Sequence, residues 1–294
     1  MAWFQVNFFS VSLGRQVGVH VLLPAEMPGP IPATGSEGAG KQKFKTLYLL
    51  HGYMGNANDW LINTPINELS QQYGLAVVMP SGDNGFYVDQ PTSGVKGASY
   101  IGQELVEYTR KIFPLSEKRE DTIIAGLSMG GYGAIRNGLA FSDTFGHVIG
   151  LSSALVINTI KDIGEEVNML GVNKYYYERI FGDPAKVEFG PDDPRSIAKG
   201  LLDSGKELPD LYFACGYNDS LSNANRDLHR YLDSIGFAHV YEEGPGTHEW
   251  PFWRKFLARG LERALGKPAG GFMNPFFIDN YDPEFDVIGK EEKI

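Results

Sequence analysis

The sequence predicts an α/β fold in which a mostly parallel sheet of eight strands carries helices on both faces. Two observations predict it. Several short apolar runs lack polar alternation, which is typical of strands buried on both faces of a parallel sheet. Segments with helical spacing separate many of these runs, and such alternation favours a doubly wound domain.

The first two expected strands, residues 4–11 and 17–23, read as an antiparallel pair rich in β-branched and aromatic residues. The other six expected strands are residues 46–50, 75–79, 122–125, 148–151, 211–214 and 238–241. The expected helices are residues 59–73, 100–113, 129–140, 222–235 and 251–265.

A glycine-rich turn between a strand and a helix adds to this prediction. Residues 126–130 read G-x-S-x-G around Ser128, directly after the expected strand 122–125. The motif alone occurs by chance, but a strand before it and a helix after it are the context of a nucleophile elbow in the α/β-hydrolase fold. We therefore expect Ser128 to be a nucleophile, and the alternative is a structural turn with an incidental serine.

A serine elbow needs two backbone N–H donors for the substrate carbonyl oxygen. The expected strand 46–50 ends in His51-Gly52-Tyr53, where the glycine permits a sharp turn. The N–H groups of Tyr53 and Met129 are the expected oxyanion hole. For His51 we favour a role in stabilising this loop over a role as catalytic base.

The acid and the base of such a triad follow the serine in the order Ser, acid, His. Asp219 lies in the loop after the expected strand 211–214, and His248 lies in a Gly-Pro loop after the expected strand 238–241. We expect His248 to act as base and Asp219 to orient it. The alternatives are that Asp219 caps the helix beginning near Leu221 and that His248 is an incidental surface histidine.

Residues 1–265 are expected to form one α/β-hydrolase domain. Residues 152–209 break the strand–helix rhythm and are interpreted as an insertion of short helices and loops, or a partial cap. The Pro-, Gly- and Ser-rich loop within residues 24–42, including 28–41, is expected to be mobile. Residues 266–294 are interpreted as a C-terminal arm on the domain or on a partner subunit, and a homo-oligomer stays open.

The formal net charge of −10 argues against nucleic acid and anionic membranes as partners. The single cysteine, Cys215, cannot form an internal disulfide, and we expect it to be a packed residue. No leader peptide or bilayer-spanning apolar stretch is recognised, so the expectation is a cytoplasmic protein. Loop aspartates such as Asp83 and Asp89 lack ligand spacing, and neither a metal nor a cofactor is expected.

Five stretches carry a resemblance to a known family: LYLLHGYMGNANDW, VVMPSGDNGFYVD, IIAGLSMGGYGA, ACGYNDSLSNAN and GTHEWPFW. Together they resemble the tributyrin esterase group of the esterase D family of α/β-hydrolases. Residues 63–65 and 86–87 are more distantly similar to the antigen 85 mycolyltransferases. The resemblance implies the triad Ser128, Asp219 and His248, oxyanion donors at Tyr53 and Met129, and activity as a carboxylesterase, S-formylglutathione hydrolase, or carbohydrate acetyl or feruloyl esterase.

We expect a small-molecule or carbohydrate ester as substrate, cleaved at a short acyl group. Trp60, Tyr87 and Trp250 are candidate substrate contacts at the mouth of the site, although packing is the commoner role of aromatic residues. A thioesterase of the S-formylglutathione hydrolase type, an acyltransferase to a sugar hydroxyl, and a non-catalytic binding protein are the alternatives.

Overall fold

A computed structural model describes residues 1–24 and 43–268, and these residues contain one eight-stranded sheet in the order β1-β2-β4-β3-β5-β6-β7-β8. The strands are β1 (Ala2–Ser10), β2 (Arg15–Leu23), β3 (Lys45–Leu50), β4 (Leu75–Pro80), β5 (Thr122–Leu127), β6 (His147–Leu151), β7 (Asp210–Gly216) and β8 (His239–Gly244). Strand β2 runs antiparallel to β1 and β4. The remaining strands, β4, β3, β5, β6, β7 and β8 in their order across the sheet, are parallel to one another. The predicted fold class is confirmed.

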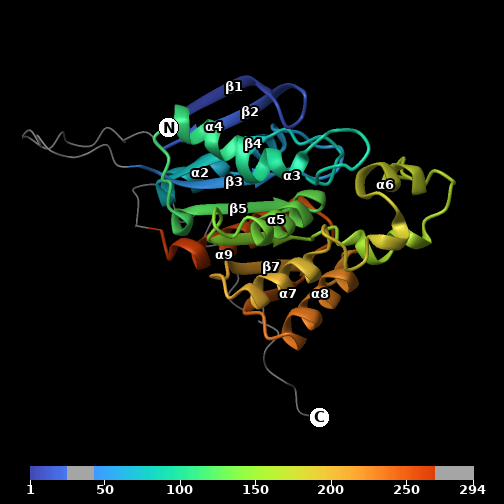
Figure 1. Ribbon diagram of the computed structural model, residues 1–294. Coiled ribbons are helices and arrows are strands. Elements are labelled where there is room, and N and C mark those ends of the chain that lie inside the picture. Colours follow the sequence, from blue (N-terminus) through green and yellow to red (C-terminus); the bar gives the residue numbers. More distant parts are fainter. Residues whose placement is uncertain (25–42, 269–294) are drawn as a thin grey trace, which may run out of the picture.

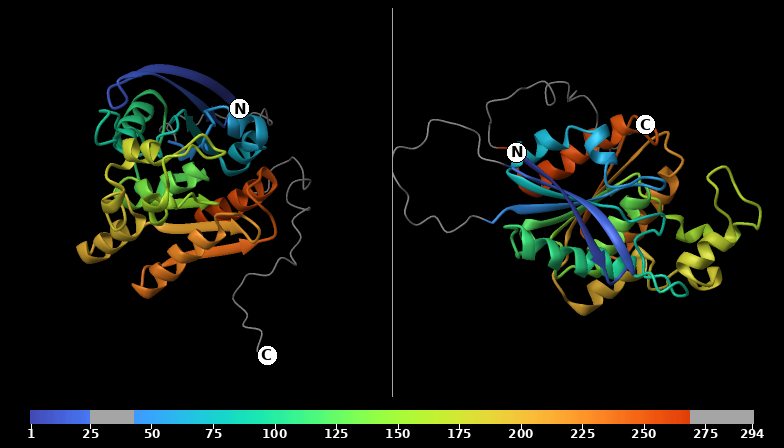
Figure 2. Two further views of the ribbon diagram at one scale, coloured as in Figure 1. Left: turned by 90° about the vertical axis from the view of Figure 1, so that its right-hand side faces the viewer. Right: turned by 90° about the horizontal axis from the view of Figure 1, so that it is seen from above.

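Helices cover both faces of this sheet (Figures 1 and 2). They are α1 (Asp59–Asn63), α2 (Ile66–Tyr73), α3 (Gly97–Ser99), α4 (Leu105–Ile112), α5 (Met129–Ala140), α6 (Lys174–Phe181), α7 (Pro194–Ser204), α8 (Ser222–Ser234) and α9 (Trp250–Leu265). Short 3₁₀ or π turns occur at Tyr100–Glu104, Arg119–Asp121, Val156–Asn158, Ile160–Asp162 and Pro184–Lys186. Within residues 1–24 and 43–268, no helix is both long and apolar enough to cross a bilayer.

The apolar runs of the parallel strands are explained by two cores, one on each face. In β3, Tyr48 and Leu50 belong to the core beneath α4, α5, α7 and α8, whereas Leu47 and Leu49 belong to the core beneath α1, α2 and α9. Successive side chains of a strand point to opposite faces. Every position in the middle of such a strand is therefore apolar.

The expected helix 59–73 is two helices, which corrects the prediction. Thr64 is extended (φ −140°, ψ 158°) between α1 and α2, and Pro65 follows it. A proline disfavours helical geometry in the residue before it and cannot donate a backbone hydrogen bond. The apolar spacing continues across the break because both pieces pack on the same face.

Residues 152–209 divide into two parts. Helix α7 packs against α5 and α8 and so contributes to the layer over the sheet. Helix α6 and its flanking loops project from the rest of the molecule at the right of Figure 1. Both helices have side-chain caps at their N-termini, Asn173 for α6 and Asp193 for α7. The expected loop 28–41, and the expected arm from residue 269 onward, lie outside the described residues.

Candidate active site

Ser128 sits on a sharp turn between β5 and α5 with φ 54° and ψ −118°. Non-glycine residues rarely adopt a positive φ, and such strain is typical of functional turns. The two motif glycines make the turn possible. A Cβ on Gly126 would lie 2.3 Å from the carbonyl oxygen of Gly130, and a Cβ on Gly130 would lie 2.5 Å from the carbonyl oxygens of Leu50 and His51.

The backbone around Ser128 is held from both sides. Its N–H donates to the carbonyl of Leu151 at 2.8 Å. Its carbonyl accepts from the N–H groups of Ala154 at 2.9 Å and Tyr132 at 3.0 Å. The end of β6 and the first turn of α5 therefore fix the strained residue, and the side chain stands at the carboxyl edge of the sheet.

The structure brings the three expected triad residues together in a hydrogen-bonded row. Nε2 of His248 lies 2.9 Å from Oγ of Ser128, and Nδ1 of His248 lies 2.9 Å from Oδ2 of Asp219. The Asp219 side chain is fully buried, whereas that of His248 is 36% exposed. Oδ1 of Asp219 also accepts the N–H of Leu221 at 2.9 Å, so this carboxylate braces the start of α8 as well as contacting the histidine.

The loops of the acid and the base touch along their backbones. The N–H of Tyr217 donates to Gly244 at 2.8 Å, and the N–H of Asn218 donates to Gly246 at 3.2 Å. A Cβ on Gly216 would lie 2.4 Å from the carbonyl oxygen of Gly246, so only glycine permits this approach. Main-chain contacts thus set the distance between the loops that carry Asp219 and His248.

Proton positions follow from these contacts. Burial acts to raise the pKa of Asp219, but hydrogen bonds from His248, the Leu221 N–H and Ser152 outweigh it, and the net pKa is lowered. The carboxylate is therefore ionised at neutral pH and accepts the Nδ1 proton of His248. The lone pair of Nε2 then faces the Ser128 hydroxyl, as a general base requires.

Two further residues, which the sequence did not single out, support Asp219 and His248. Ser152 follows β6 with φ 43°, is fully buried and contacts the Asp219 carboxylate. Its Oγ accepts the indole N–H of Trp253 at 3.1 Å. The Trp253 ring also packs edge-on against His248, with centroids 5.0 Å apart. Trp253 thus links the two partners from α9.

The expected oxyanion loop lies against the elbow. A Cβ on Gly52 would be 3.5 Å from Cβ of Ser128 and 2.7 Å from a Leu127 methyl. Among the described residues, the N–H groups of Tyr53 and Met129 have no hydrogen-bond acceptor. Both donors are therefore available to a ligand oxygen.

The prediction that His51 stabilises this loop is confirmed. Its Nε2 accepts the N–H of Gly82 at 2.9 Å, and its Nδ1 then donates to the carbonyl of Gly52 at 2.7 Å. Burial lowers the pKa of His51, so the ring stays neutral and in this tautomer. The side chain ties the oxyanion loop to the segment after β4.

Two of the three expected substrate contacts are packed beneath the site, which corrects that part of the prediction. Trp60 and Tyr87 are each 1% exposed. Trp60 donates to the carbonyl of Leu50 at 3.0 Å, and Tyr87 donates to that of His51 at 2.8 Å. They support the oxyanion loop from below. Trp250 is half-buried and packs edge-on against Trp60.

The family model described as "Putative esterase" matches residues 10–264. The chain belongs to this esterase family. An acetyl esterase of Caldicellulosiruptor saccharolyticus is 40% identical over 262 residues, which are 89% of this chain and 97% of that protein. The more distant resemblance is also confirmed, since the Ag85B mycolyltransferase of Mycobacterium avium is 27% identical over 76% of this chain and 77% of that protein.

Solved structures agree with this assignment. The fluorophosphonate-binding serine hydrolase F of Staphylococcus aureus superposes with a TM-score of 0.78 at 30% identity, covering 90% of this chain and 98% of that one. An S-formylglutathione hydrolase of the same organism gives a TM-score of 0.76, also at 30% identity and with the same coverage. This esterase is accordingly a carboxylic ester hydrolase of the α/β-hydrolase fold.

Proposed function

We propose that this esterase is a serine carboxylesterase that hydrolyses short-chain acyl esters through an acyl-enzyme on Ser128. The observation that carries the proposal is the row of contacts from Ser128 Oγ through the His248 imidazole to Asp219, 2.9 Å at each step. The strained turn presents the hydroxyl, and the buried carboxylate fixes the imidazole tautomer.

The reaction follows from these positions. As Ser128 Oγ bonds to the ester carbonyl carbon, its proton passes to Nε2 of His248. The carbonyl oxygen becomes an oxyanion that the N–H groups of Tyr53 and Met129 stabilise. The C–O bond then breaks, and the leaving alcohol takes the proton from His248. Water attacks the acyl-enzyme by the same route, which releases the carboxylic acid and restores Ser128.

The preference for short acyl groups rests on the relative named acetyl esterase. The hydroxyl of Tyr53 donates to the carbonyl of Leu170 at 3.3 Å, so the loop before α6 adjoins the oxyanion loop. Met54 and Leu170 are exposed there, 74% and 62%. We further propose that residues 152–209 are an insertion in a single domain of residues 1–265 and that its projecting part borders the alcohol side of the substrate.

A second candidate is hydrolysis of the thioester S-formylglutathione, favoured by the similarity to the S. aureus enzyme of that name. The chemistry on Ser128 would be the same, with a thiol as leaving group. Glutathione conjugates are anionic and this chain carries a net charge of −10, which favours neutral esters, including acetylated or feruloylated sugars.

The test is a panel of p-nitrophenyl esters of increasing acyl length, acetylated oligosaccharides, feruloyl esters and S-formylglutathione. We expect kcat/KM to be highest for two- to four-carbon acyl groups, and a higher value for S-formylglutathione would establish the second candidate instead. Adding a sugar acceptor and analysing products separates hydrolysis from acyl transfer.

The role of Ser128 is tested by Ser128→Ala and by labelling with a fluorophosphonate. We expect at least a roughly 10⁴-fold loss of kcat and no labelling, because the nucleophile is missing. The matched control is Ser220→Ala, an exposed serine next to Asp219, which should keep both. Full activity of Ser128→Ala would refute the mechanism.

A further inference from the structure

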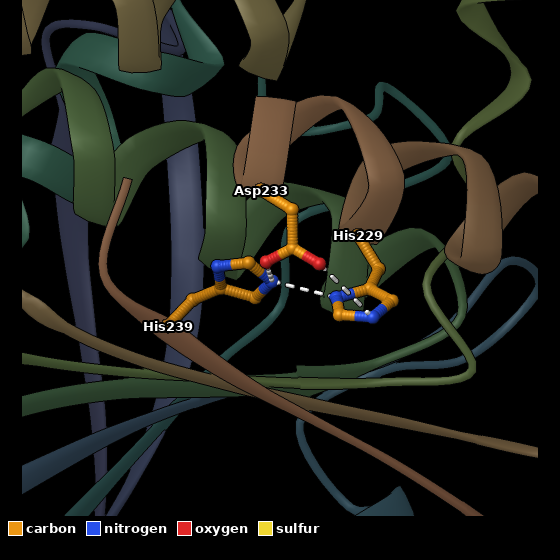
Figure 3. Close-up of side chains that lie close together, drawn as sticks. All are labelled: His229, Asp233 and His239. Carbon is orange, nitrogen blue, oxygen red and sulfur yellow. Dashed lines mark hydrogen bonds and ion pairs between the residues drawn. The ribbon is translucent and has the colours of Figure 1, made fainter. Parts of the chain in front are cut away.

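Two histidines and an aspartate lie close together far from Ser128, where α8 faces the start of β8. His229 and Asp233 are four residues apart on one face of α8, and His239 is the first residue of β8. One ligand atom from each lies within 4.8 Å of the others. Figure 3 shows the three side chains pointing toward one another.

His239 has one nitrogen committed to the backbone and one directed into the cluster. Its Nδ1 lies 2.7 Å from the carbonyl oxygen of Phe237, so it carries the proton and donates it. Its Nε2 therefore presents a lone pair to His229 and Asp233. The His239 side chain is only 3% exposed.

The protons of a neutral cluster do not satisfy all of these contacts. Nδ1 of His229 lies 2.8 Å from Nε2 of His239 and would have to donate to it. Nε2 of His229 would then carry no proton, although it lies 3.5 Å from the Asp233 carboxylate. A cation between the two histidines removes this conflict, because both facing nitrogens become its ligands and the Asp233 carboxylate becomes a third.

We propose that His229, Asp233 and His239 bind one zinc ion. The ligand atoms are Nδ1 of His229, Nε2 of His239 and a carboxylate oxygen of Asp233, with water in a fourth position. Two imidazoles and a carboxylate suit zinc, and the bond from His239 Nδ1 to a backbone carbonyl is the outer contact typical of metal-bound histidines.

The geometry needs only a small adjustment to accept the ion. Zinc–nitrogen bonds of about 2.0–2.1 Å in tetrahedral geometry place two nitrogens about 3.3 Å apart. The observed separation of 2.8 Å must therefore widen by about half an ångström. The side chains of His229 and Asp233 are 36% and 62% exposed and can move, whereas Phe213 stacks against His239 and holds it in place.

The ion would join α8 to an edge strand. Strand β8 ends the sheet and leads into the loop that carries His248, whereas His239 lies at the opposite end of this strand. The site therefore has a structural role in fixing β8 and takes no part in the ester chemistry.

The experiment uses protein without a polyhistidine tag, stripped with a chelator and dialysed. Zinc chloride is titrated by calorimetry, and Tm is measured with zinc and with excess EDTA. The variants are His229→Gln and Asp233→Asn, both at partly exposed positions of α8. Asp227→Asn is the matched control, since Asp227 lies on the same helix and pairs with Arg230 instead.

We expect one zinc per wild-type chain at this site and a Tm rise of roughly 5 °C at zinc concentrations about 100 times Kd. His229→Gln should weaken this binding by at least about 100-fold and abolish the Tm rise, and Asp233→Asn should reduce both. Asp227→Asn should behave as wild type. Failure of the wild type to bind zinc, or equal binding by all variants, would overturn the proposal.

Discussion

The most informative perturbation is Ser152→Ala, because this buried hydroxyl lies between α9 and Asp219, the proposed catalytic acid. Alanine keeps the Cβ, so the free-energy cost of the positive φ at residue 152 is the same in the variant as in the wild type. Three interactions are lost: the acceptor for the Trp253 indole N–H at 3.1 Å, one of the hydrogen bonds that lower the pKa of Asp219, and a hydrogen bond with the Cys215 thiol. The contacts of Asp219 with Leu221 and His248 remain.

The magnitudes follow from these losses. A buried N–H without an acceptor costs about 1–3 kcal/mol of unfolding free energy. Asp219 keeps most of its hydrogen bonds, so we expect about 1.4 kcal/mol of transition-state stabilisation to be lost, which is a tenfold fall in kcat/KM. We expect the fall in kcat, because KM does not depend on how firmly the acid is held.

The pH dependence has a definite sign. Against the effect of burial, hydrogen bonds hold the native pKa of Asp219 below its unfolded value. Its carboxylate therefore stabilises the fold above an unfolded pKa of about 3.9, and this contribution is lost as pH falls through the native pKa. Ser152→Ala brings the two values closer, so its destabilisation is largest near neutral pH and smaller in acid.

Urea unfolding at pH 7 and pH 3, together with steady-state kinetics on a short-chain aryl ester, measures these effects. Trp253→Phe keeps a ring beside His248 but removes the N–H, so the double variant should lose less than the sum of the single losses. Trp3→Phe serves as the control tryptophan, since Trp3 is 60% exposed on β1 and donates to His20 instead. Strict additivity, or a Ser152→Ala variant equal to the parent in kcat and stability, would refute the reasoning.

Three further outcomes are expected. Gly130→Ala should reduce soluble protein and Tm sharply, because its Cβ would lie 2.5 Å from the Leu50 carbonyl oxygen, and a normal Tm would contradict the tight elbow. Glu104→Gln should cost about 1 kcal/mol in urea unfolding at pH 7, because solvent screens this partly exposed carboxylate. Burial acts to raise the pKa of Glu104, but hydrogen bonds from Ser10 and from the β1–β2 turn outweigh it and lower this pKa. The loss of stability should therefore shrink as pH falls through that pKa, and a pH-independent loss would contradict this. Burial raises the pKa of Cys215 to about 12, so a thiol reagent at pH 8 should label only urea-unfolded protein, and rapid labelling of folded protein would contradict its packing.

The fold was predictable because its signals are local. Each parallel strand buries both faces, as in β3, and therefore appears in the sequence as a continuous apolar run. The elbow around Ser128 is recognisable from two glycines that lie between a strand and a helix. Thr64-Pro65 also indicates the break between α1 and α2, but the apolar spacing continues across it and therefore predicts one helix.

The supporting contacts were not predictable because they depend on packing between distant residues. Ser152 and Trp253 meet across 101 positions, and nothing in either neighbourhood indicates the partner. Aromatic residues occur both in cores and at the mouths of binding sites, so the sequence does not distinguish the two positions for Trp60 and Tyr87. Only the three-dimensional structure shows that both are buried. For His229 and Asp233 the helical spacing was visible, but the approach of His239 depends on the turn before β8.

The glycine contact between the acid and base loops has a consequence for redesign. Because Gly216 lies against Gly246, an insertion or deletion in either loop displaces its partner as well, and the two lengths can only change together. The projecting segment around α6 instead meets the Tyr53 loop through a hydrogen bond at Leu170, so its length can change without displacing Gly216 or Gly246. Libraries aimed at new alcohols should be built there.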